Sequence, residues 1–424
     1  MFLYSCLIIL TNCSAKNNTH TGNPQNNQSQ NTTGAKTYAF IIGTLEWSDP
    51  NLHSFEKKNR KDQELYELLK NTGVNEENAV FLMDQKATLS NIKEKMSSLL
   101  SKSEKGSHFI FYYAGHGMHD NGRYYFANYD ISTNDPASTG LDLDIIGNII
   151  VKNFKGERVT LWADCCYSGG LSEVAETLSK KGFKTCALTS STNTNTSTGN
   201  WTYSQAIIDG LRGDGIMDRN SDGKISLNEM GAEVRDAMKF RERQLNSYVV
   251  YNLDGDQTVF SEVRSKINRN NPLTGNYVFA TYNGKWEIAR IKGVNNDQYD
   301  CEFYFYSDKQ VQQLPKEKIR PPHFISYKTG EKINVEYEGK WYNATIEKQD
   351  GDFYFITYND YDHSYDEWVL YDRIRTGNEK KVEVLWEGKY YTADLLETKN
   401  DKSYVHYDGY DYTWDEWTDS KNIK

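Results

Sequence analysis

Residues 108–117 have the sequence HFIFYYAGHG, a largely apolar and aromatic run that ends in a His between two glycines. Short apolar runs bounded by glycine are typical of strands that are buried on both faces of a parallel sheet. Residues 159–170, VTLWADCCYSGG, follow the same pattern and end in an acid, two cysteines and two glycines. Because reactive side chains gather at the carboxyl ends of parallel strands, a catalytic site is expected where these two strands end.

The chain before and between these runs alternates between strand and helix patterns. Residues 38–43 and 79–83 are further short apolar runs, whereas residues 54–71 place leucines among charges as an amphipathic helix does. Another helix is expected to begin at Thr88 or Ser90, either of which can serve as its N-cap. Strands separated by helices predict an α/β fold, with a mostly parallel sheet covered by helices on both faces.

His116 and Cys166 are the candidate catalytic pair. They are 50 residues apart, each is followed closely by Gly, and each ends a predicted strand. A thiol becomes a strong nucleophile when a nearby imidazole takes its proton. Gly117 lets its backbone N–H approach a substrate carbonyl, so this amide and that of Cys166 are predicted to stabilise the oxyanion. The alternative is a structural His and a small buried Cys, which are common when each occurs alone.

Residues 112–117 and 164–169 resemble the two active-site signatures of the caspase superfamily, and are closest to those of metacaspases and bacterial caspase-like peptidases. The resemblance extends over residues 38–262 and includes Asp62. It implies a caspase-like cysteine peptidase domain over residues 37–270, which hydrolyses peptide bonds in protein or peptide substrates.

The resemblance also assigns roles to single residues. In the family's Asp-x-Cys-x-Ser-Gly pattern the nucleophile lies two residues after the Asp, which is Cys166, and Cys165 takes the variable position. Metacaspases usually have a His after the nucleophile, where this chain has Tyr167; that departure leaves His116 as the base but weakens assignment to metacaspases proper. Asp164 corresponds to the acid that lines the S1 pocket of metacaspase-like enzymes and selects Arg or Lys before the scissile bond. The alternative is that Asp164 only caps the next helix.

Residues 218–229, DRNSDGKISLNE, fit the calcium-binding loop of an EF-hand, with Gly223 at the sharp turn. Hard cations such as Ca²⁺ take oxygen ligands, which this loop is rich in. The predicted metal site comprises Asp218, Asn220, Asp222, Lys224, Ser226 and Glu229. The side that enters the loop is short and rich in Gly, so a single loop that orders the active-site region is expected. The alternative is a polar turn with the same spacing.

The first 36 residues resemble a targeting segment followed by a tether. Residues 1–16 contain an apolar run too short to span a bilayer, which ends at Cys13 in a pattern similar to a bacterial lipoprotein signal. Asn12 stands where a small residue is usual and no Lys or Arg precedes the run, so an ordinary buried stretch is the alternative. Residues 17–36 are rich in Asn, Thr, Gln and Gly, which predicts a flexible linker. The expectation is an exported bacterial protein that is lipid-anchored on the periplasmic or surface side of a membrane.

Residues 276–424 contain an internal repeat of about 50 residues. Its marks are a Gly-Lys-aromatic turn, which begins at Gly284, Gly339 and Gly388, and alternating patterns typical of half-buried antiparallel strands. The predicted units are small all-β, SH3-like barrels of about five strands each, over residues 276–322, 328–375 and 378–424.

The second and third repeats resemble Tudor-like or chromo-barrel modules, in which an aromatic strand is followed by Asp-Glu-Trp, here ending at Trp368 and Trp417. Tudor-like aromatic residues can surround a methylated cation, and the alternative is that they only fill small barrel cores. Residues 331–375 hold 11 acidic and 5 basic residues, and the whole chain has a net charge of −10. Nucleic acid is therefore not expected as a partner of the barrels, whereas a cationic or peptide partner is.

Two further hypotheses compete with a simple exported peptidase. A catalytically silent scaffold would use the barrels and the calcium loop only for binding, although the chain retains both His116 and Cys166. A self-processing enzyme would cut itself in the segment that holds Lys180, Lys181 and Lys184, which agrees with cleavage after a basic residue. In the main interpretation the barrels position the substrate or attach the enzyme to a partner.

Overall fold

The first sheet has six strands in the order β10-β8-β7-β3-β1-β2. Five of them run parallel to their neighbours, and β10 pairs with β8 in the antiparallel direction. The computed structural model describes residues 35–305 and 308–424, so the signal segment expected over residues 1–16 and most of the expected linker lie outside it. The strands are β1 (Thr37–Gly43), β2 (Ala79–Met83), β3 (His108–Ala114), β7 (Arg158–Asp164), β8 (Lys184–Thr189) and β10 (Tyr248–Tyr251).

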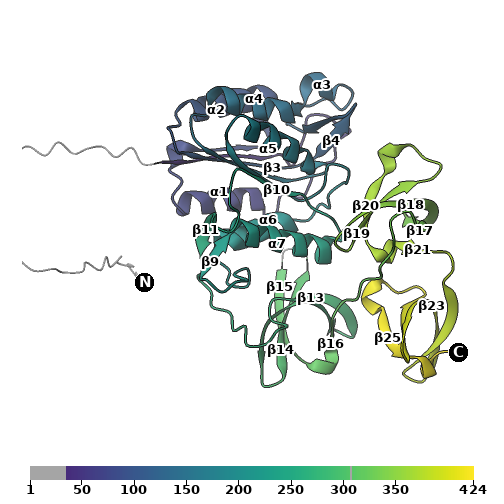
Figure 1. Cartoon of the computed structure of the whole chain (residues 1–424). Coiled ribbons are helices and arrows are strands. Elements are labelled where there is room, and N and C mark those ends of the chain that lie inside the picture. Colours follow the sequence, from purple (N-terminus) through teal and green to yellow (C-terminus); the bar gives the residue numbers. More distant parts are fainter. Residues whose placement is uncertain (1–34, 306–307) are drawn as a thin grey trace, which may run out of the picture. The chain divides into compact units, whose positions relative to one another are not determined.

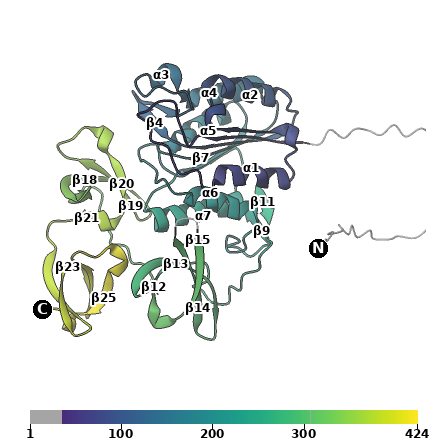
Figure 2. The ribbon, with the colours of Figure 1, turned by 180° about the vertical axis from the view of Figure 1, so that it is seen from behind.

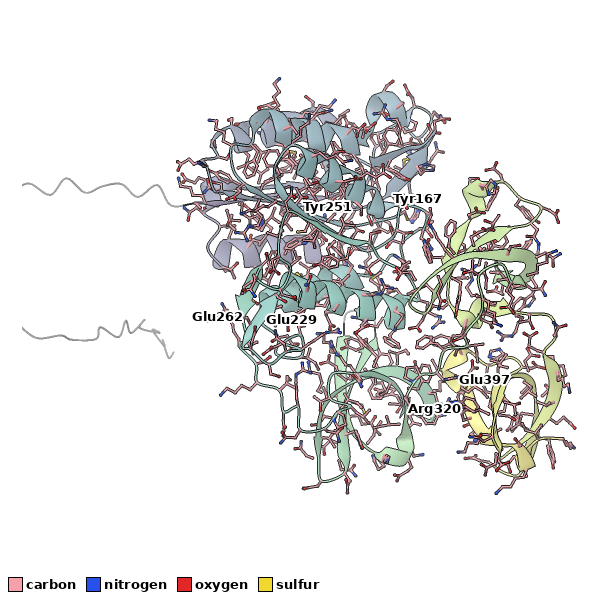
Figure 3. The ribbon with its side chains drawn as sticks, viewed as in Figure 1. Tyr167, Glu229, Tyr251, Glu262, Arg320 and Glu397 are labelled. Carbon is pink, nitrogen blue, oxygen red and sulfur yellow. The ribbon has the colours of Figure 1, made fainter. Side chains whose placement is uncertain are left out.

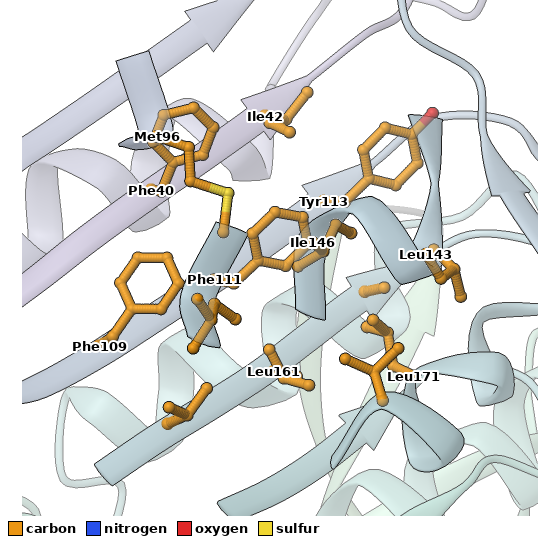
Figure 4. Packing of buried hydrophobic residues seen from close by; sticks show 14 of the residues in the cluster. Phe40, Ile42, Met96, Phe109, Phe111, Tyr113, Leu143, Ile146, Leu161 and Leu171 are labelled. Carbon is orange, nitrogen blue, oxygen red and sulfur yellow. The ribbon is translucent and has the colours of Figure 1, made fainter. Parts of the chain in front are cut away.

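Helices cover both faces of this sheet (Figures 1 and 2). Strand side chains point alternately to the two faces, so Phe40 and Ile42 join the core beneath α2, α4 and α5, whereas Ala39 and Ile41 join the core beneath α1, α6 and α7. Figure 4 shows the first of these cores, in which all labelled side chains are buried. The helices are α1 (Lys61–Asn71), α2 (Leu89–Ser101), α4 (Leu143–Asn153), α5 (Leu171–Lys180), α6 (Thr202–Leu211) and α7 (Leu227–Ala237).

Smaller elements surround the sheet. A three-stranded sheet follows β3, a two-stranded sheet includes the end of the predicted calcium loop, and a short helix precedes β6. These elements are β4 (Gly117–Asp120), β5 (Arg123–Phe126), β6 (Leu141–Asp142), β9 (Lys224–Ser226), β11 (Val259–Glu262) and α3 (Pro136–Thr139).

The predicted α/β class with a mostly parallel sheet is confirmed, and one helix boundary was wrong. The helix expected over residues 54–71 begins only at Lys61. The segment before it is a loop, in which the Phe55 ring packs 4.5 Å from the His116 ring. Arg60 marks the boundary, because its guanidinium lies 2.6 Å from the carboxylates of both Asp62 and Asp84. The other boundary tested was correct: Thr88 caps α2 and accepts the Asn91 N–H at 3.2 Å.

Three antiparallel sheets follow, with five, five and four strands. The third falls short of the expected five because its last segment forms a single bridge, between Val384 and Ile423. The first barrel has β12 (Tyr277–Tyr282), β13 (Lys285–Asn295), β14 (Gln298–Phe305), β15 (Asp308–Pro315) and β16 (Ile319–Arg320). The second has β17 (Lys332–Tyr337), β18 (Lys340–Asp350), β19 (Phe353–Tyr358), β20 (Glu367–Val369) and β21 (Ile374–Arg375). The third has β22 (Lys380–Trp386), β23 (Lys389–Lys399), β24 (Lys402–Tyr407) and β25 (Glu416–Asp419).

The three barrels share a structural signature that matches the internal repeat of the sequence. The second strand of each is 11 residues long, and each carries a bulge at the same place, after Ile291, Ile346 and Leu395. A bulge bends its strand and increases the local twist, which is how a short sheet curls into a barrel.

All three barrels make polar contacts outside themselves. Arg290 of the first barrel forms a buried ion pair with Glu233 of α7, with side chains 5% and 6% exposed. In the second barrel, Asp352 accepts from Lys239 at 2.9 Å. Arg320, labelled in Figure 3, links the first barrel to Glu416 of the third at 3.1 Å. No helix within the described residues is long and apolar enough to cross a membrane.

Candidate active site

The two strands that end in reactive residues are direct neighbours in the sheet. Strands β3 and β7 are parallel, and their last residues, Ala114 and Asp164, are register partners. His116 and Cys166 each follow two residues later, so the chain delivers both to the same edge of the sheet. They line one cavity of about 530 Å³, together with Asp164. The sequence expectation that these three residues come together agrees with this geometry.

Aromatic rings and one carbonyl hold the His116 imidazole. The rings of Trp47 and His53 lie with their centroids 4.4 and 4.6 Å from that of His116. The His116 Nε2 atom lies 3.0 Å from the carbonyl oxygen of His53. Because a carbonyl oxygen can only accept, Nε2 carries the proton and Nδ1 is left with a free lone pair. Burial lowers the pKa of His116, which keeps the ring neutral and able to act as a base.

Backbone amides surround the Cys166 sulfur. The N–H of Ser197 donates to Sγ at 3.1 Å, and the amides of Gly117 and of Cys166 itself also lower the thiol pKa. Burial is the larger influence and raises the pKa of Cys166, so the resting thiol is protonated. Within the part of the chain that the structure describes, no hydrogen bond joins the His116 ring to Cys166 Sγ. Such bonds are often long in free enzymes and shorten when substrate binds.

Gly117 is required by the close approach of two backbone segments. A Cβ atom at this position would lie 1.8 Å from the carbonyl oxygen of Cys166. Any side chain would therefore push β4 away from the loop that carries Cys166. With Gly, the Gly117 amide stays beside the Cys166 sulfur, which is where the sequence predicts an oxyanion donor.

Asp164 is a buried acid without a cationic partner. Its carboxylate accepts hydrogen bonds from Ser204, from the side-chain hydroxyl at 2.5 Å and from the backbone N–H at 3.3 Å. Burial raises the pKa of Asp164 to about 7. No Lys or Arg of the described residues forms an ion pair with it. The next helix, α5, has Gly170 at its N-cap and no side-chain cap, so Asp164 does not cap that helix and instead contacts the first turn of α6.

The neighbours of Cys166 differ from it in environment. Cys165 is 3% exposed, and burial raises the pKa of its thiol well above the usual range. Tyr167, labelled in Figure 3, adopts a left-handed backbone conformation with φ of 55° and donates its N–H to the carbonyl of Asn195 at 2.9 Å. That turn separates the half-buried Cys166 from the buried Cys165.

Two parts of the site could not be found from the sequence. The loop that carries His53 has no periodic pattern, and its contribution is a backbone carbonyl, which every residue has. The loop before α6 presents the Ser197 amide to the sulfur, and its polar residues resemble any surface loop. A weak signal was present in the Ser- and Thr-rich composition of residues 189–198, which is unusual directly after a buried strand.

The predicted calcium loop has its turn at Gly223, where φ is 84°. Its carboxylates point to loop amides: Asp218 accepts from the N–H of Asp222 at 3.1 Å, and Glu229 accepts from the N–H of Arg219 at 2.8 Å. Glu229 also completes a capping box with Ser226 at the start of α7. Across residues 35–305 and 308–424, no three or more His, Cys, Asp or Glu side chains converge as a metal site. The oxygen atoms of the loop are of the kind that a hard cation such as Ca²⁺ takes, but here the carboxylates bond to loop amides, and Ca²⁺ binding stays a prediction.

Comparison with protein families gives three matches. Residues 54–175 match the metacaspase peptidase C14 domain, and residues 331–378 match the Agenet domain. Residues 377–424 match the Tudor-knot domain, described as an RNA binding activity-knot of a chromodomain. A search of curated protein sequences found no match.

Two solved structures are similar to the chain at low sequence identity. A protein from Geobacter sulfurreducens is 14% identical with a TM-score of 0.39, and the match covers 54% of this chain and 100% of that one. Caspase-1 from Spodoptera frugiperda is 13% identical with a TM-score of 0.35, and the match covers 55% of this chain and 92% of that one.

Proposed function

We propose that the metacaspase peptidase C14 domain of this chain, followed by its Agenet and Tudor-knot domains, is an active cysteine endopeptidase that cleaves after Arg or Lys. The observation that supports it most is the meeting of His116, Cys166 and the unpaired Asp164 on one cavity. A silent scaffold would not need a neutral imidazole with a free lone pair near a thiol surrounded by amides. That scaffold remains the alternative that the experiments below would favour if no cleavage occurs.

In the proposed reaction His116 Nδ1 takes the proton of the Cys166 thiol, and the sulfur attacks the carbonyl carbon of the scissile bond. The negative charge that develops on the carbonyl oxygen is stabilised by the N–H groups of Gly117 and Cys166. His116 then gives its proton to the leaving amine, which leaves an acyl-thioester. Water, deprotonated by His116, hydrolyses that ester and restores the thiol. The His53 carbonyl holds the imidazole in the tautomer that these steps need.

Asp164 is the basis of the proposed specificity. A carboxylate buried beside the nucleophile with no cation of its own is stabilised when a guanidinium or ammonium group enters the cavity. An acidic side chain would meet a like charge, and an apolar one would leave the acid unpaired.

Peptides with Arg or Asp before the scissile bond test this function. We expect hydrolysis of the Arg-terminated fluorogenic peptide to be at least about 100-fold faster, since a wrong charge in a buried site costs several kcal/mol. The measurement is kcat/KM for a pair of peptides that differ only at that residue. Faster turnover of the Asp peptide would contradict the specificity, and no turnover of either would favour the scaffold.

We further propose that Ca²⁺ binds the loop of residues 218–229 and assists cleavage. The loop leads directly into α7, whose Glu233 holds the first barrel through Arg290. We expect a chelator to lower cleavage of the Arg peptide and added Ca²⁺ to restore it, because metal binding stabilises the folded arrangement. Asp222→Asn should weaken Ca²⁺ binding in calorimetry, and Asp254→Asn, in a turn outside the loop, is the matched control. Unchanged activity in the chelator would contradict the assisting role.

Self-processing, if it occurs at the lysine-rich segment, has to act on a tight turn. Lys180 ends α5 and Lys184 begins β8, and Gly182 between them has φ of 95°. Cleavage of folded chains follows local opening, so this turn must open before the enzyme cuts it. Equal intact masses of the wild type and the Cys166→Ala variant would contradict self-processing.

The remaining proposals concern location and partners. The Agenet and Tudor-knot matches support binding of a peptide or protein partner by the barrels. The acidic balance of residues 331–375 supports a cationic partner over nucleic acid. The lipoprotein-like segment supports export and a lipid on Cys13 in a bacterial membrane. Absence of lipid label from the wild-type protein in its own host would contradict the anchor.

A further inference from the structure

The wall of the active-site cavity includes residues from outside the peptidase sheet. Tyr304 of β14 and Lys309 of β15, both in the first barrel, line the same cavity as His116 and Cys166. The first barrel therefore completes the binding site rather than only carrying it. Side chains on this wall can contact a substrate at positions other than the one that Asp164 recognises.

Arg241 lies on this wall next to the first barrel, and no ion pair among the described residues neutralises its charge. It lies in the helical segment Met238–Glu242 that continues α7, is half-buried and lines the cavity. Its neighbours are paired: Lys239 with Asp352 at 2.9 Å, and Arg243 with Asp372. No hydrogen bond or ion pair of Arg241 occurs within the described part of the chain.

Stacking on an aromatic ring holds the Arg241 guanidinium in place. Its central carbon lies 4.1 Å from the centroid of the Tyr304 ring. Tyr304 is itself fixed, because its hydroxyl donates to Glu302 at 2.7 Å. The next residue, Glu242, accepts a hydrogen bond from Asn200 at 3.0 Å and another from Thr202, which anchors the backbone of this segment. A planar guanidinium held in this way, with its N–H groups free, suits a carboxylate, which it can bind with two parallel hydrogen bonds.

A second cation lies close to Arg241, but an acid already pairs with it. Lys309 also lines the cavity wall, and its Nζ lies 2.7 Å from Asp209 and 5.9 Å from the centroid of the Tyr304 ring. Lys309 is thus a second cation near the same ring, held by an acid outside the cavity wall. Asp164, at the end of β7, is the buried acid of the same cavity and faces Ser204 of α6. The cavity therefore presents an unpaired acid at one place and an unpaired guanidinium at another.

We propose that Arg241, stacked on Tyr304 of the first barrel, forms a subsite that binds an Asp or Glu side chain of the substrate. This inference rests on the proposed peptidase function and narrows its substrate class. The preferred substrate carries a basic residue before the scissile bond and an acidic residue at one other position within the cavity. The first barrel determines specificity by fixing the Arg241 side chain.

Peptide binding to the full-length Cys166→Ala protein tests the subsite without relying on turnover. The probes are fluorescent peptides with Arg before the scissile bond and either Glu or Gln at each other position in turn, followed by anisotropy. At one position the Glu peptide should bind about tenfold tighter than its Gln isostere, which is the usual strength of one hydrogen bond to a charged group. In this background Arg241→Met should reduce that ratio to about one, and Arg241→Glu should favour Lys over Glu there.

Arg264→Ala is the matched control, because Arg264 is exposed, lies outside the cavity wall and carries the same charge. It should keep the Glu-to-Gln ratio of the parent protein. The proposal is overturned if no position shows a Glu preference, or if Arg241→Met retains it while the Gln peptide still binds. Cleavage of Arg peptides by the wild type without any Glu preference would leave the peptidase function standing and remove the subsite. A Glu preference in binding without any cleavage would support the subsite and remove the peptidase function.

Discussion

We expect the Cys166→Ala variant to lose cleavage of Arg-terminated peptides by more than about a thousandfold, because the proposed acyl-thioester could no longer form. Cys165→Ala is the control, because it removes the thiol of the neighbouring residue and leaves Cys166 in place. The Cys165 thiol is 3% exposed and burial raises its pKa well above the usual range, so it is not the ionised nucleophile. Turnover of a fluorogenic Arg peptide and labelling by an Arg-ketone probe measure both variants.

The same experiment distinguishes an enzyme from a scaffold. His116→Ala should lose nearly as much activity as Cys166→Ala, and the double variant should be little worse than either single one, since the two residues act as a unit. Two results together would contradict Cys166 as the nucleophile. Cys166→Ala would keep its activity, and Cys165→Ala would lose activity although it unfolds at the same temperature as the wild type. If the wild type neither cleaves the peptide nor reacts with the probe, the chain is a scaffold.

Local sequence pattern was enough to predict that His116 and Cys166 follow neighbouring strands. Apolar runs before His116 and Cys166 specify strands buried on both faces, and parallel strands deliver their last residues to one edge. Gly at position 117 was expected to let its amide approach a substrate carbonyl, whereas the close approach that the structure shows is to the carbonyl of Cys166. These features depend on residue types within a few positions of one another.

His116 and Cys166 are held by contacts from segments far away in the sequence. The local pattern of residue types does not encode these contacts. The His53 carbonyl reaches His116 across 63 residues, and the Ser197 amide reaches Cys166 across 31. Both contributions come from the backbone, so no residue type marks them. The same holds for the start of α1: the charges that precede Lys61 look helical, and the ion pairs of Arg60 decide where the helix begins.

The role of the barrels changes most when the structure is considered. The repeat pattern suggested modules that position the substrate or attach the enzyme to a partner. In the structure, Tyr304 lines the cavity. Asn195, whose carbonyl accepts from Tyr167 beside Cys166, exchanges two hydrogen bonds of 3.2 Å with the backbone of Trp368. The second barrel therefore supports the loop that presents Ser197 to the sulfur. Such contacts explain how binding at a barrel could alter cleavage without any change in the catalytic residues.

The second large effect is expected at Asp164. Asp164→Asn keeps the shape of the side chain and its hydrogen bonds to Ser204 but removes the charge. We expect kcat/KM for an Arg peptide to fall by about 100-fold or more, because an entering guanidinium is left buried without a partner. Ser204→Ala, assayed at a pH well above 7, is the matched control. It removes a hydrogen bond that lowers the pKa of Asp164, and at that pH the carboxylate still keeps its charge. A fall in Asp164→Asn no larger than in Ser204→Ala would contradict the charge role.

The pH profile separates this role of Asp164 from a structural one. Burial raises the pKa of Asp164 to about 7, and only the ionised carboxylate attracts a cationic side chain. kcat/KM for the Arg peptide should therefore rise as pH increases through about 7, whereas burial lowers the pKa of His116, which is already neutral in that range. Asp164→Asn should abolish that rise, because the titrating group is gone while His116 is unchanged. A rise of the same size in the variant would assign the titration to another group. It would also contradict the place of Asp164 in the S1 pocket, because a carboxylate that selects Arg loses this effect when it is protonated.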